Sequence, residues 1–143
     1  MQEALSSKRM DWCCKSVGEM SGHKLFVDTN IIIHFLSGDK TLTELLEGKS
    51  IFISIITKLE LLSYHDLTER DQKKLEGFLS ECTVVELNST VQNKTVEIRK
   101  QYKLKLPDSI FVASAIWLDL PIISSDRSLR NLKEGTILYY EKK

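Results

Sequence analysis

Apolar positions along the chain follow two patterns, short runs typical of buried strands and longer stretches with helical spacing. The short runs predict five strands, at residues 25–27, 51–53, 83–87, 121–124 and 136–140. The helical spacing predicts helices at residues 31–36, 41–47, 55–64, 68–79, 89–102 and 108–118, with a short helix after Asp126. Strands that alternate with helices indicate a parallel sheet covered on both faces. We therefore predict a three-layer α/β/α domain.

The predicted helix starts rest on residue types that cap helices well. Thr29 or Asn30 is expected to cap the first helix, and Ser89 the helix at residues 89–102. Thr41 and Glu44 have the spacing of a capping box. The helix at residues 108–118 is apolar or small nearly all round, which predicts a central, buried position.

The first 22 residues lack this patterning. They carry Trp12, Cys13 and Cys14 without neighbouring apolar residues, whereas clear patterning begins at Lys24. We predict one domain at residues 23–143, preceded by an N-terminal extension at residues 1–22. Two interpretations of this extension stay open. It is either upstream sequence that is translated although the biological start is Met20, or a disordered or loosely docked N-terminal arm.

Composition limits the functions that the chain can have. Of its 143 residues, 42% are hydrophobic and 28% are charged, which suits one compact domain. Its 20 basic and 20 acidic residues give a formal net charge of zero, so contact with a polyanion needs a local patch or a metal.

The three cysteines, including Cys82, form neither a disulfide framework nor a zinc spacing, and no apolar run has the length of a membrane span. We expect a cytoplasmic protein.

Four acidic residues stand beside predicted buried elements. Asp28 follows the first strand and Asp126 follows the strand at residues 121–124, so both are expected at the same edge of a parallel sheet. Asp108 stands at a helix N-terminus, and Glu60 lies among leucines. Taken singly, each has a structural interpretation: the aspartates as caps or turn residues, and Glu60 as a capping-box partner of Thr57 or a solvent-facing residue.

Taken together, these placements favour a cation site, because clustered carboxylates repel unless a hard cation neutralises them. Oxygen ligands without cysteine or histidine indicate Mg²⁺ or Mn²⁺ rather than zinc. The three histidines, His23, His34 and His65, are dispersed, and the glycines form no phosphate-binding loop. A nucleophile elbow of the Gly-x-Ser-x-Gly type is also missing from the sequence.

Four short motifs carry a family resemblance across residues 24–140. They are FVDTN at Asp28, TKLEL at Glu60, LPDSIFVASA at Asp108 and IISSD at Asp126. In order, spacing and context they resemble the PIN domain, and specifically the VapC-like ribonuclease toxins of bacterial toxin–antitoxin pairs. The chain departs from the family at Leu129, where an aromatic residue is common, and that difference concerns packing.

The resemblance implies a metal-dependent endoribonuclease. Its acidic cluster would be Asp28, Glu60, Asp108 and Asp126, which would hold Mg²⁺ or Mn²⁺, with Asn30 and Ser124 in supporting positions. Hydrolysis would leave a 5′-phosphate and a 3′-hydroxyl. The implied partners are an RNA substrate, a cognate antitoxin protein and a second copy of the chain in a homodimer. Candidate cations facing the substrate are Lys58, Arg127 and Arg130.

Three other functions fit parts of the pattern. A catalytically silent PIN-like binding module would be expected to have lost acids, whereas this chain keeps all four. A phosphatase of the haloacid-dehalogenase kind needs a second aspartate two residues after the first, where this chain has Asn30. A phospho-receiver domain needs an acid pair before its phosphorylated aspartate, and none is visible in the sequence.

Overall fold

A five-stranded, all-parallel sheet forms the centre of the computed structural model, which describes residues 23–141. The strand order is β3-β2-β1-β4-β5. The strands are β1 (Lys24–Val27), β2 (Ser50–Ser54), β3 (Thr83–Val85), β4 (Ile122–Ser124) and β5 (Ile137–Tyr139). The five predicted strands are therefore present, with ends that differ by one or two residues. The predicted extension at residues 1–22 lies outside the described residues.

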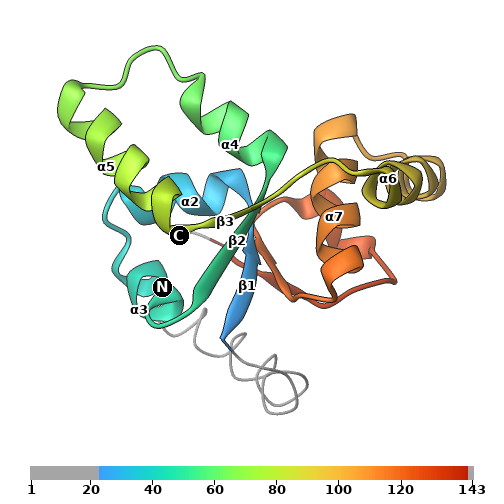
Figure 1. Ribbon diagram of the computed structural model, residues 1–143. Coiled ribbons are helices and arrows are strands. Elements are labelled where there is room, and N and C mark those ends of the chain that lie inside the picture. Colours follow the sequence, from blue (N-terminus) through green and yellow to red (C-terminus); the bar gives the residue numbers. More distant parts are fainter. Residues whose placement is uncertain (1–22, 142–143) are drawn as a thin grey trace.

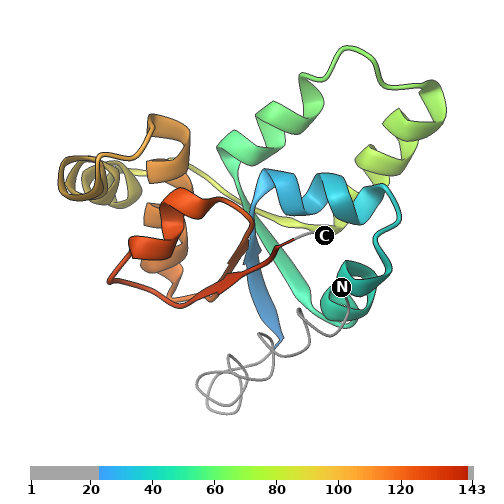
Figure 2. The same ribbon diagram turned by 180° about the vertical axis from the view of Figure 1, so that it is seen from behind.

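Helices cover both faces of this sheet (Figures 1 and 2). They are α2 (Thr29–Leu36), α3 (Lys40–Leu46), α4 (Ile55–Leu62), α5 (Glu69–Glu81), α6 (Ser89–Tyr102) and α7 (Leu106–Leu118), with a 3₁₀ helix η2 (Arg127–Asn131). Figure 1 shows α2 to α5 on one side of the sheet and α6 and α7 on the other. The predicted three-layer α/β/α architecture is confirmed. Among the described residues, no helix is both long and apolar enough to span a membrane.

Alternation along β1 divides the core into two clusters. Leu25 and Val27 pack with α2, α3, α4 and α5, whereas Phe26 packs with α6 and α7 on the opposite face. All three side chains are at most 1% exposed, as expected for a central strand buried on both faces. The ring of Phe26 lies 5.1 Å from that of Phe111, which anchors α7 against the sheet. The predicted buried position of α7 is confirmed.

The strand order places a topological switch point beside β1. The chain builds β1, β2 and β3 in one direction and then returns to place β4 on the other side of β1. In register, Val27 pairs with Ile123, so β1 and β4 end at nearly the same level. Ligand sites of open parallel sheets lie at the carboxyl ends of the strands, next to such a switch point.

Three helix caps differ from the sequence prediction. The cap of α2 is Asp28, whose carboxylate accepts a hydrogen bond from the Thr29 backbone at 2.7 Å, so Thr29 begins the helix. In the same way Asp39 caps α3 and Asn88 caps α6. The expected caps Asn30, Thr41 and Ser89 lie inside their helices. The prediction was wrong because each true cap, with extended backbone and a side-chain oxygen, lies one or two residues earlier.

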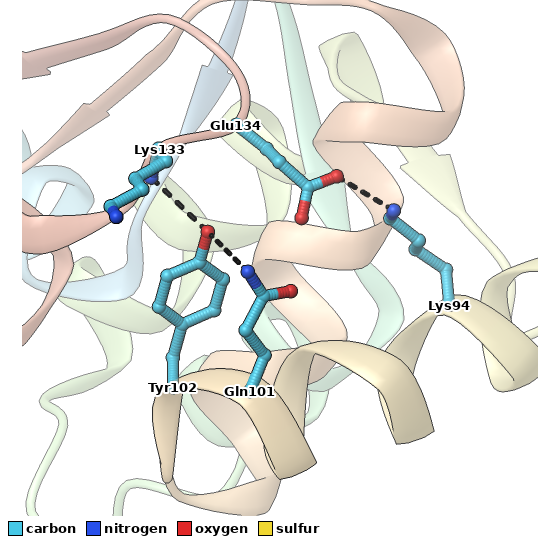
Figure 3. A network of polar contacts seen from close by, with 5 residues as sticks. All are labelled: Lys94, Gln101, Tyr102, Lys133 and Glu134. Carbon is cyan, nitrogen blue, oxygen red and sulfur yellow. Dashed lines mark hydrogen bonds and ion pairs between the residues drawn. The ribbon is translucent and has the colours of Figure 1, made fainter.

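Polar contacts fasten the segment after η2 to α6 (Figure 3). The Tyr102 hydroxyl accepts hydrogen bonds from the Lys133 backbone at 3.2 Å and from the Gln101 side chain at 3.3 Å. Lys94 forms an ion pair with Glu134, with 2.7 Å between Nζ and Oε1. These contacts fix the segment that follows η2, while β4 fixes the segment that precedes it.

Candidate active site

All four predicted acids line one open hollow of about 560 Å³ at the carboxyl edge of the sheet. Its lining consists of Asp28, Thr29, Asn30, Ile56, Leu59, Glu60, Ser63, Tyr64, Asp108 and Asp126. Asn30, to which the family resemblance gave a supporting position, is also among the lining residues. The candidate cations Lys58, Arg127 and Arg130 are not among the lining residues, and the guanidinium of Arg130 lies over the ring of Tyr139 at 5.0 Å.

Asp28 caps α2 and also lines the hollow. One carboxylate oxygen accepts from the Thr29 backbone, and the other accepts from the Ser124 hydroxyl at 2.6 Å. Burial raises the pKa of Asp28 above its usual range, although these two hydrogen bonds act in the opposite direction. The neighbouring charges of Asp126 and Glu60 raise the pKa of Asp28 further. The cap interpretation is thus correct for this residue without excluding a role in chemistry.

Ser124 connects Asp28 to Asp126. Its side chain is fully buried at the end of β4, where its hydroxyl donates to Asp28 and accepts from the Asp126 backbone at 3.0 Å. Asp126 caps η2 by accepting from both the backbone and the hydroxyl of Ser128, at 2.9 and 2.8 Å. The sequence drew attention to Ser124 but not to Ser128, which fixes the Asp126 carboxylate.

Asp108 stands in the first turn of α7, which begins two residues earlier than predicted, at Leu106. Burial, together with the charges of Asp126, Asp28 and Glu60, raises the pKa of Asp108 to about 6. The nearby Lys105 ammonium opposes this shift. The other three carboxylates are therefore close enough to Asp108 for their charges to act on it.

Glu60 reaches the hollow from the exposed side of α4. Its Oε1 accepts a hydrogen bond from the Thr29 hydroxyl at 2.8 Å, which joins α4 to the start of α2. A capping box with Thr57 is the wrong interpretation of Glu60, because the cap of α4 is Ser54, whose hydroxyl accepts from the Thr57 backbone at 3.1 Å. Sequence reasoning missed Thr29, whose place in the FVDTN motif was the available signal.

The donor chemistry of the hollow fits a hard divalent cation that keeps much of its hydration shell. Its charged lining groups are all carboxylates, which suit Mg²⁺ and Mn²⁺. Within residues 23–141, however, no three acidic, histidine or cysteine side chains converge as the ligands of one ion. Mg²⁺ usually retains several waters and binds one or two carboxylates directly, so three converging protein ligands are not required.

Comparison with known proteins identifies related folds. The family model for the PIN domain matches residues 25–135. A toxin–antitoxin complex from Klebsiella pneumoniae is similar, with 27% sequence identity, a TM-score of 0.69, and coverage of 76% of this chain and 92% of that chain. VapBC2 from Rickettsia felis, bound to a promoter DNA fragment, has 18% identity, a TM-score of 0.71, and coverage of 82% and 99%. No curated protein matches the chain.

The raised pKa of Asp108 predicts a specific dependence of stability on pH. A carboxyl whose folded pKa is near 6 favours the folded state increasingly as the pH falls through that value toward the unfolded pKa of about 3.9. In EDTA, the free energy of unfolding should therefore rise between about pH 7.5 and about pH 5, and it should rise less in Asp108→Asn.

Urea unfolding of both proteins at the two pH values measures this difference. Asp66→Asn is the matched control, because Asp66 is an exposed carboxylate outside the hollow, and it should keep the pH dependence of the wild type. An identical pH dependence in wild type and Asp108→Asn would contradict the prediction.

Proposed function

This chain belongs to the PIN domain family, and on that premise we propose that it is a metal-dependent endoribonuclease and the toxin of a toxin–antitoxin pair. The main supporting observation is the set of four carboxylates around one open hollow, at the edge of the sheet where such folds bind ligands. Membership of the PIN domain family also argues against the phosphatase and the phospho-receiver domain, because both belong to other families.

The toxin assignment draws on the related structures. The Klebsiella pneumoniae protein is described as a toxin–antitoxin complex, and the present chain covers 92% of the compared chain at 27% identity. We therefore infer a cognate antitoxin as a protein partner. The homodimer expected from the resemblance and the cytoplasmic location expected from the cysteines remain predictions.

Asp28, Glu60, Asp108 and Asp126 are the residues that would hold Mg²⁺ or Mn²⁺. A bound divalent cation supplies charge neutralisation for a phosphodiester and acidifies water for its hydrolysis. Burial and the charges of neighbouring acids raise the pKa values of Asp28 and Asp108, which supports this proposal because a nearby positive charge would favour the ionised carboxylates.

The protein groups around the acids would orient them. Ser124 and the Thr29 backbone donate to the two oxygens of Asp28, and the backbone of Ser128 donates to Asp126. Leu59 and Tyr64 are 52% and 46% exposed and give the hollow an apolar wall, which suits contact with unstacked bases of single-stranded RNA. The substrate phosphate would then lie against the acids and the bases against this wall.

The silent binding module remains the second candidate, because no three carboxylates converge on one point among the described residues. The same hollow could then bind RNA without cleaving it. Enzymatic and growth experiments separate the two candidates.

The purified protein should cleave single-stranded RNA in Mg²⁺ or Mn²⁺, and excess EDTA should stop it. Asp28→Asn and Asp126→Asn should each lower the cleavage rate by at least about 100-fold, the scale on which loss of one charge-stabilising group acts in other enzymes. Asp66→Asn should cleave like the wild type. Gel analysis of end-labelled RNA measures the rate and identifies the ends, and cleavage that persists in EDTA would exclude the metal mechanism.

Expression of the chain without a partner should slow the growth of a bacterial host, and Asp108→Asn should relieve the inhibition. The reason is that this change removes one of the four carboxylates at the hollow while keeping the shape of the side chain. Growth curves at matched protein levels make the comparison. Equal growth inhibition by both proteins would show that toxicity does not depend on the acidic cluster.

A further inference from the structure

A line of hydroxyl groups runs from the core of the domain to Glu60. It begins at Ser54, which is fully buried, and continues through Thr57, which is 1% exposed. The Ser54 and Thr57 hydroxyl oxygens are 3.3 Å apart, and those of Thr57 and Thr29 are 3.1 Å apart. The last step, from the Thr29 hydroxyl to Glu60 Oε1, is 2.8 Å.

The number of protons available decides which group donates and which accepts in each of these hydrogen bonds. Each hydroxyl has a single proton, and an ionised carboxylate only accepts, so Thr29 donates to Glu60. Thr29 must then accept from Thr57, and Thr57 accepts from Ser54. The Ser54 oxygen in turn accepts from the Thr57 backbone as the cap of α4, which fixes the inner end of the line.

This arrangement fixes a side chain that would otherwise be mobile. Glu60 is exposed, and ordering a free glutamate side chain costs conformational entropy. Thr29 is β-branched and therefore stiff about its first side-chain torsion. Its backbone nitrogen also donates to Asp28, so one residue orients two of the four acids.

We propose that Thr29 is a positioning residue, which holds Glu60 at the hollow in an orientation ready for a divalent cation. This inference rests on the proposed function and deepens it. The family resemblance gave supporting positions to Asn30 and Ser124, whereas the contact geometry assigns this one to Thr29, backed by Thr57 and Ser54.

Calorimetric titration of the full chain with Mn²⁺ alone tests the inference. Thr29→Val removes the hydroxyl at nearly constant volume and should raise the Kd for Mn²⁺ by about tenfold, the lower end of the effect of groups that orient metal ligands. Thr29→Ala should give the same loss and guards against strain from the valine. Thr29→Ser keeps the donor and should restore the affinity, and Thr90→Val, at an exposed threonine of α6, is the matched control.

A double-mutant cycle separates positioning of Glu60 from a general disturbance. In a Glu60→Gln background, Thr29→Val should change the Kd by less than about twofold, because the charged partner is already lost. An equal loss of affinity in both backgrounds would overturn the inference, as would wild-type Mn²⁺ affinity in Thr29→Val and Thr29→Ala. If the wild type neither binds Mn²⁺ nor cleaves RNA, the proposed function itself fails, and this inference fails with it.

Discussion

The hydrogen bond from the Ser124 hydroxyl to Asp28 joins two residues that are 96 positions apart in sequence, and the geometry of the site depends on it. It forms because β1 and β4 are parallel neighbours that end at nearly the same level. The same hydroxyl accepts from the Asp126 backbone, so one buried serine sets the relative positions of two acids. Asp108 and Glu60 are then brought to the same hollow by α7 and α4.

Holding four carboxylates at one edge is electrostatically unfavourable. Burial and mutual repulsion raise the pKa values of Asp28 and Asp108. The hydrogen bonds from Ser124 and Thr29 oppose the shift of Asp28 only in part, and the Lys105 charge opposes that of Asp108 only in part. Such an arrangement is expected at a functional site, where local destabilisation is retained for binding or catalysis. The proposed hydrated divalent cation would neutralise this charge, because carboxylate oxygens and water are the ligands that it prefers.

The sequence was sufficient for the layers and the order of elements, because the hydrophobic period within each segment distinguishes strands from helices. It also singled out the four acids that line the hollow, through their places beside predicted elements and through the family resemblance. It was insufficient for helix caps. Where several capping residues are adjacent, as at Asp28, Thr29 and Asn30, only the backbone conformation selects one. The contact between Thr29 and Glu60 was also beyond prediction, since it arises from the packing of α2 against α4, which no local pattern encodes.

Thermal unfolding of wild type and Asp28→Asn, each in EDTA and in saturating Mn²⁺, tests the central claim that these acids form a strained cation site. Asparagine loses one of the two oxygens that accept from Ser124 and the Thr29 backbone, but it also removes one buried charge. Because burial and the neighbouring charges outweigh the two hydrogen bonds in their effect on the pKa of Asp28, the variant should melt higher than wild type in EDTA. It should also gain less from Mn²⁺, because ligand stabilisation scales with affinity. A variant that melts lower in EDTA and gains as much from Mn²⁺ as the wild type would show that Asp28 is only a structural cap.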